Sequence, residues 1–112
     1  MLDRLSQSLE RYMDLLSARQ KIVASNIANA DTPGYHTKDI DFQSELSSAL
    51  HGASPQAFEV GGLTARNDGN NVSIDREARL LAENNMRFNL ASNLLRSEIQ
   101  SIRAALQNGS NS

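Results

Sequence analysis

The side chains that could bind a metal ion are few in this sequence, and they do not cluster. Asp39 and Asp41 are one residue apart, as in Asp-x-Asp pairs that hold divalent cations. Two carboxylates at this spacing are a weak indication of a metal site when no further group of ligands accompanies them. His36 and His51 are isolated and belong to no paired ligand motif. We therefore predict that the chain binds no metal ion and no other cofactor.

Other kinds of chemistry find little support. The sequence contains no glycine-rich phosphate loop, no nucleophile motif and no convincing acid–base pair, so we do not expect an enzyme or a small-molecule substrate. Cysteine is absent, which excludes disulfides and thiol chemistry. The formal net charge is -2 and no block of lysine and arginine occurs, which argues against nucleic acid as a partner. Two glycosylation sequons, at Asn71 and Asn108, are matches to a short pattern that often arises by chance.

The N-terminal segment, residues 1–30, has the periodicity of an amphipathic helix. Its apolar residues recur every three or four positions, so they fall on one broad face, and Asp3 suits the position that caps the first turn. The residues of this stripe are Leu2, Leu5, Leu9, Tyr12, Leu16, Val23 and Ala30.

The C-terminal segment, residues 74–112, has a second apolar stripe and a short tail. We expect its helix to begin near Asp75 with Ser73 as the cap, and to stop at Gly109. The stripe contains Leu81, Phe88, Ala91, Leu95, Ile99, Ile102 and Leu106. A row of asparagines at positions 85, 89 and 93 runs beside it. Solvent exposure is the default interpretation of this row, and hydrogen bonding between subunits is the alternative.

These two helices predict the fold class. Only 4% of the residues are aromatic, and two such helices cover each other's wide apolar faces only in part. We predict a mainly α fold in which two long amphipathic terminal helices form a coiled-coil-like hairpin or a bundle between subunits. The irregular middle includes a flexible loop over residues 51–73, which is rich in Gly, Asn and Ser. No apolar run approaches the ~20 residues of a membrane span.

Between the first helix and the loop, residues 31–50 contain an abrupt change of direction. Pro33 ends the helix, and Pro33 and Gly34 fit the central positions of a type II turn, in which the second residue has a positive φ. The segment from Tyr35 to Phe42 suits an extended arm with the acidic and apolar side chains on opposite sides. A short helix from Phe42 to Leu50 is possible. We interpret the Pro-Gly turn as an elbow that directs this arm.

The stretch "NIANADTPGY", followed by "KDIDF", resembles the signature of the flagellar basal-body rod proteins. The proximal rod subunits have the most similar motifs, which here are "DTPGY", "DIDF" and the opening "MLDRL". Their entry into the C-terminal helix is resembled by "GNNVSIDREARLLAENN". The region from His51 to Gly69 looks shorter than in typical members. The signature and elbow residues here are Asn26, Ile27, Ala28, Asn29, Thr32, Pro33, Gly34, Tyr35, Asp39, Ile40, Asp41 and Phe42.

The resemblance implies a structural subunit that polymerises through its terminal helices into the drive shaft linking the motor ring and export gate to the distal rod and hook. Its partners would be further copies of itself, other rod proteins, the membrane ring adaptor and the type III export gate. It would be exported without a cleaved signal peptide and assemble in the periplasm. The interface would use the two stripes, except for Tyr12 and Ala30. The alternative is a helical adaptor or export chaperone acting as a defined dimer, which would have no use for the Pro-Gly elbow.

Overall fold

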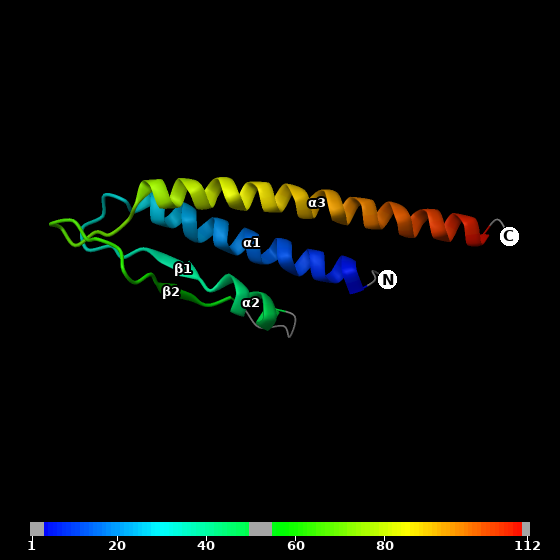
Figure 1. Ribbon diagram of the computed structural model, residues 1–112, viewed down its shortest axis with the longest axis horizontal. Helices are drawn as coiled ribbons and strands as arrows, with labels where there is room; N and C mark the ends of the chain where they lie inside the picture. Colours follow the sequence, from blue (N-terminus) through cyan, green and yellow to red (C-terminus); the bar gives the residue numbers. More distant parts are fainter. Residues whose placement is uncertain (1–3, 50–54, 111–112) are drawn as a thin grey trace.

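The computed structural model describes residues 4–49 and 55–110 and is an elongated, mainly helical molecule of 72 × 25 × 17 Å. Two long helices, α1 (Arg4–Ala28) and α3 (Ile74–Ser110), lie side by side and run in opposite directions (Figure 1). The short elements β1 (Lys38–Ile40), α2 (Phe42–Ala49) and β2 (Ala57–Glu59) lie beside α1 (Figure 1). The predicted mainly α composition and the two long terminal helices are confirmed.

The apolar core is small and lies mostly between α1 and its neighbours. Ala91 of α3 is 2% exposed, and its short side chain lets the two helices approach closely. Few apolar side chains are buried among the described residues, so the core stabilises the fold only modestly. Its buried apolar members are Leu15, Leu16, Val23, Ile40, Val72 and Ala91.

The helix ends differ in part from the sequence prediction. Ser73 caps α3 as predicted, because its Oγ accepts a hydrogen bond from the Arg76 amide at 3.3 Å. The prediction that Gly109 ends this helix is wrong, since α3 continues to Ser110. A glycine costs only about 1 kcal/mol inside a helix, so it does not by itself enforce a stop. Asp3, the predicted cap of the first helix, lies outside the described residues, as does Leu50.

The middle of the chain contains a small sheet that the sequence did not predict. β1 and β2 pair antiparallel, with Lys38 opposite Glu59 and Ile40 opposite Ala57. Residues 57–59 therefore form a strand inside the segment predicted as a flexible loop. The arm also ends earlier than predicted, because Phe42 begins α2. The carboxylate of Asp41 accepts a hydrogen bond from the Ser44 amide at 3.3 Å, which favours helix formation at that point.

α3 is longer than its partner. It has 37 residues against 25 in α1, and its C-terminal end continues beyond the N-terminal end of α1 (Figure 1). We call residues 100–109 the overhang. At 1.5 Å per residue it is about 15 Å long, and Leu106 within it is 69% exposed. None of the described helices has an apolar stretch long and uncharged enough to cross a membrane.

The overhang should be the least protected part of α3 in the isolated chain. A helix without tertiary packing is marginal in water, so we expect its amides to exchange with solvent about tenfold or more faster than those of residues 77–91, which face α1. Hydrogen exchange resolved along the chain measures this difference. Equal protection from residue 77 to residue 109 would contradict it.

Candidate assembly site

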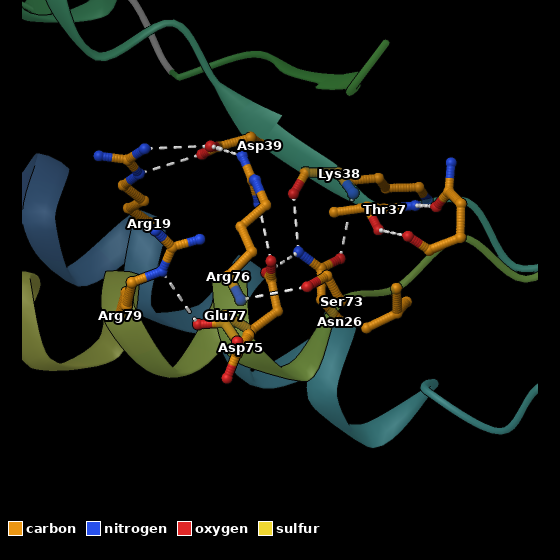
Figure 2. A network of polar contacts seen from close by, with 12 residues as sticks. Arg19, Asn26, Thr37, Lys38, Asp39, Ser73, Asp75, Arg76, Glu77 and Arg79 are labelled. Carbon is orange, nitrogen blue, oxygen red and sulfur yellow. Dashed lines mark hydrogen bonds and ion pairs between the residues drawn. The ribbon is translucent and has the colours of Figure 1, made fainter. Parts of the chain in front are cut away.

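A cluster of polar and charged side chains joins α1, β1 and α3 near the turn end of the molecule (Figure 2). We call it the polar junction. Because its charged members are largely removed from water, each must have a partner to be tolerated there. Its members are Arg19 and Asn26 from α1, Asp39 from β1, and Arg76 and Glu77 from α3.

Asn26 lies at the centre of the junction and is fully buried. Its Nδ2 donates to the Lys38 carbonyl at 2.8 Å and to Oε1 of Glu77 at 2.5 Å. Its Oδ1 accepts from the Lys38 amide at 3.1 Å and from the Tyr35 hydroxyl at 2.9 Å. A side-chain amide has two hydrogens to donate and two acceptor lone pairs, so Asn26 uses its full capacity. A side-chain amide is suited to this place because it can satisfy the two donors and the two acceptors around it.

Asp39 is 5% exposed, so it is buried like its neighbour Ile40. Two arginines make burial of the carboxylate favourable. That the two side chains lie on opposite sides of the arm stays a prediction. Arg19 donates to its two oxygens at 3.0 Å each, and Arg76 donates to one of them at 2.7 Å. Burial by itself would raise the pKa of Asp39, but the hydrogen bonds from Arg19 and the Ile40 amide outweigh it and hold the pKa below its usual value.

Arg76 links the two carboxylates of the junction. Its Nη1 lies 2.7 Å from Oε2 of the fully buried Glu77, while its Nη2 reaches Asp39. Burial would lower the pKa of Arg76, yet the hydrogen bond to Glu77 and the one to Asp39 raise it overall. With Arg19, the junction contains two positive and two negative groups. The acids are thus neutralised by fixed cations, an arrangement suited to holding elements together rather than to catalysis.

The turn after α1 is held by a second polar contact region. Gly34 has φ of 75°, and the Tyr35 amide donates to the Thr32 carbonyl at 3.2 Å across the turn. The Gly34 amide donates to the Asp68 carbonyl at 2.8 Å. Buried Asn70 donates through Nδ2 to the carbonyls of Asn29 at 2.9 Å and of Thr32 at 2.8 Å. The turn is therefore tied to a segment more than thirty residues later in the chain.

The same segment also holds the start of the arm. Oδ1 of Asn71 accepts from the Thr37 amide at 2.6 Å, and the Asn71 amide donates to the Tyr35 carbonyl at 3.2 Å. Asn71, which begins one sequon match, thus has a structural role. Two stretches singled out in the sequence thus contact each other, because Asn70 and Asn71 of "GNN" form hydrogen bonds with the backbone of "NIANADTPGY".

The remaining signature residues are mostly at the surface. Ile27 is 37% exposed, Ala28 and Pro33 are exposed, and Asn29 is half-buried. Phe42 is half-buried, with its ring edge-on to Tyr12 of α1 at 5.6 Å. The structure thus brings Asn26, Tyr35 and Asp39 into one cluster and leaves most of the others outside it. Sequence reasoning missed Arg19, Arg76 and Glu77, whose charges alone did not reveal that they are buried.

The residues predicted for the assembly interface divide into three groups. Leu16, Val23 and Ala91 are buried within the chain itself. Leu5, Phe88 and Leu106 are exposed, and Leu2 lies outside the described residues. The half-buried group consists of Leu9, Leu81, Leu95, Ile99 and Ile102.

A further apolar row on α3 was missed. Met86, Leu90 and Leu94 are 72%, 61% and 50% exposed, and their four-residue spacing places them on one side of the helix, away from α1. We call them the outer row. Their spacing could have been found in the sequence, where the stronger stripe concealed it. The asparagines at 85, 89 and 93 are exposed, in agreement with the default interpretation.

Metal-binding chemistry finds no support within residues 4–49 and 55–110, where no three His, Cys, Asp or Glu side chains are grouped to hold an ion. His36 instead lies 3.3 Å from Glu59, at the exposed edge of the sheet. What remains is a fixed polar junction at one end and exposed apolar side chains along the helices.

Known proteins resemble the chain over most of its length. The family model described as flagella basal body rod protein matches residues 13–36, which include Asn26 and the turn. The flagellar basal body rod protein FlgB of Escherichia coli (strain K12) is 34% identical over 137 aligned residues, covering 97% of this chain and 99% of that protein. FlgB of Salmonella typhimurium (strain LT2) is 33% identical with the same coverage. FlgB of Borreliella burgdorferi (strain B31) is 32% identical over 87% of this chain and 91% of its own. The 137-residue alignments exceed the 112 residues of this chain, so those two relatives contain residues without a counterpart here.

Replacing Asn26 with alanine should destabilise the fold more than the same change at Asn29. The first change removes the hydrogen bonds that Asn26 makes to Oε1 of the buried Glu77 and to the Lys38 backbone, and each buried group left unpaired costs about 1–3 kcal/mol. We expect a loss of at least about 2 kcal/mol in the free energy of unfolding, measured with urea. Asn29→Ala is the matched control and should cost less than about 1 kcal/mol, since its side-chain hydrogen bonds are exposed. Equal losses would contradict the central role of Asn26.

Stability should fall in acid partly through Asp39. Its pKa is lowered in the folded state, so its contribution is present above the unfolded pKa, about 3.9, and is lost as the pH falls through the lower folded value. Asp39→Asn should therefore be less stable than the parent at pH 7, and the difference should shrink below about pH 4. Urea unfolding between pH 7 and pH 2.5 measures this. Asp31→Asn, at an exposed position in the turn, serves as the control. A difference that is constant with pH would refute the assignment.

Proposed function

Because the chain belongs to the family of FlgB flagellar basal body rod proteins, we propose that it polymerises through the exposed faces of α1 and α3 into the proximal rod. It is a structural subunit of the rod, in the basal body of the bacterial flagellum. In our proposal the rod formed by these helices is the drive shaft between the motor ring with its export gate and the distal rod and hook.

The observation that carries this proposal is the outer row of α3. Three large apolar side chains at least half exposed on one helix face are unusual for a protein that acts as a monomer, and such patches commonly mark protein–protein contacts. Leu5 and Leu106, which are 53% and 69% exposed, are further exposed apolar residues near the open end of the molecule. The predicted interface residues Leu16, Val23 and Ala91 would support assembly indirectly, by holding the helix pair together.

The turn end would serve a different purpose. A positive φ at Gly34, with its amide tied to Asp68, favours a fixed direction for the chain leaving α1. In our proposal this elbow and the polar junction set the angle at which the β1–β2 sheet leaves the helix pair. Phe58 on β2 is 49% exposed and would contact a neighbouring protein there.

We further propose the partners that such a subunit would meet. They are other copies of itself, other flagellar rod proteins, the membrane ring adaptor and the type III export gate. The subunit would leave the cytoplasm through that gate without a cleaved signal peptide and join the rod in the periplasm. A helical adaptor or chaperone acting as a defined dimer is not favoured by the similarity to rod proteins.

The outer row provides the test. Leu90→Asp combined with Leu94→Asp places unpaired charges in the proposed interface, where burial is costly, yet leaves the isolated chain intact because both side chains are exposed. We expect the variant to be secreted normally, to be absent from purified basal bodies, and to abolish swimming.

The matched control is Asn89→Asp with Asn93→Asp, which adds the same charge to the same helix at exposed polar positions. It should incorporate at nearly the parent level. The measurement is the amount of each variant in purified basal bodies relative to the amount secreted. If the leucine variant incorporates as well as the asparagine variant, assembly does not use this face.

A further inference from the structure

One side of the seam between α1 and α3 is hollowed along its length, and we call this hollow the seam groove. Its first section is lined by Leu16, Ser17, Asn84 and Phe88, among others. Ser17 and Phe88 also line the second section, and Leu95 lines both the second and the third. The three sections therefore form one path that begins between the helices and ends on α3 alone.

Charge changes sign along this path. The second section carries Glu10 and Asp14 of α1, four residues apart and thus on the same face. The third carries Arg96 and Arg103 of α3, two helical turns apart. All four side chains are exposed, and within the described part of the chain none of them forms an ion pair. One chain thus presents an acidic patch on α1 and a basic patch on α3.

The first section contains an unsatisfied acceptor. Asn84 is 2% exposed, and among the described residues its Oδ1 has no hydrogen-bond partner. A buried acceptor without a donor is unfavourable, so a water molecule or a donor from another chain is needed at this end of the groove.

The C-terminal part of α3 has the opposite character. It continues past the N-terminal end of α1, so none of the described helices covers its far end (Figure 1). Its exposed Leu106, its half-buried Ile99 and its two arginines form a surface that is apolar with a basic margin. The groove complements this surface, with Met13 and Phe88 as apolar lining and the two acids beside them.

We propose that residues 96–109 of α3 in one copy pack into the first two sections of the seam groove of a second copy, with Arg96 and Arg103 against Glu10 and Asp14. This inference rests on the proposed function, since it names the self-contact through which the rod subunit adds to its own kind. In this proposal the contact is head-to-tail, because each copy inserts its C-terminal segment into one neighbour and receives the segment of another. A contact of this kind leaves one free surface at each end, so it can be repeated into an open helical array.

The absence of cysteine in the sequence makes a direct test possible. Ser17→Cys and Gln100→Cys place one thiol in the acceptor groove and one on the inserted segment, on separate chains with all charges intact. When the two chains are mixed and oxidised, we expect a disulfide-linked pair in about fivefold or greater excess over a mixture of Ser17→Cys with Asn89→Cys. Asn89 is exposed on α3 but lines none of the three sections.

Charge reversal then identifies the contact. Adding Glu10→Arg and Asp14→Arg to the Ser17→Cys chain should reduce cross-linking about fivefold, because two attractive pairs become repulsive. Adding Arg96→Glu and Arg103→Glu to the Gln100→Cys chain as well should restore it. The effect should weaken at high salt. Cross-linking no greater than in the control mixture, insensitive to reversal, or not restored by the double reversal would overturn the inference.

Incorporation into basal bodies distinguishes a failure of the groove contact from a failure of the proposed function. If the charge-reversed chains enter purified basal bodies like the parent while Leu90→Asp with Leu94→Asp does not, the groove contact is wrong and assembly through the outer row stands. If all of these variants incorporate, both proposals fail.

Discussion

The side-chain amide of Asn26 is the interaction on which the arrangement of this chain depends. It binds the backbone of β1 on both its donor and acceptor sides and also contacts Glu77 of α3. Apolar contacts allow two helices to slide or rotate with little penalty, whereas a buried amide with four partners tolerates one arrangement. The position of α3 relative to α1 and β1 therefore follows from this one group more than from the small core.

The charges around Asn26 act together with it. Asp39 and Glu77 would be unstable in a buried site alone, and Arg19 and Arg76 make their burial possible. This places most of the structural specificity at the turn end of the molecule. At the opposite end α3 extends beyond the described part of α1, and few contacts fix its position there. The chain therefore has a defined arrangement at the turn end, while in our proposal neighbouring chains complete the packing at the other end.

The sequence predicted the elements better than their contacts. The 3–4 spacing of leucines and isoleucines was sufficient for both long helices, and Pro33 with Gly34 for the end of the first. The burial of Asp39 was not predicted, because it depends on arginines from two other elements that are distant in the sequence. β2 was missed because its three residues lie among turn-forming residues, and its pairing with β1 depends on contacts distant in sequence. Asn26 was singled out by resemblance, while its physical role required the structure.

The double attachment at the turn end has a consequence for how such a chain can change in length. Contacts at Thr37 and Asn71 hold together the two points where the β1–α2–β2 segment leaves the helices. Closing a longer or shorter segment between two points already held together changes the entropy only slowly with length. Residues can thus be inserted or deleted at the distal end of that segment without disturbing the helix pair, which makes it a natural point for grafting a tag or a binding peptide onto the chain.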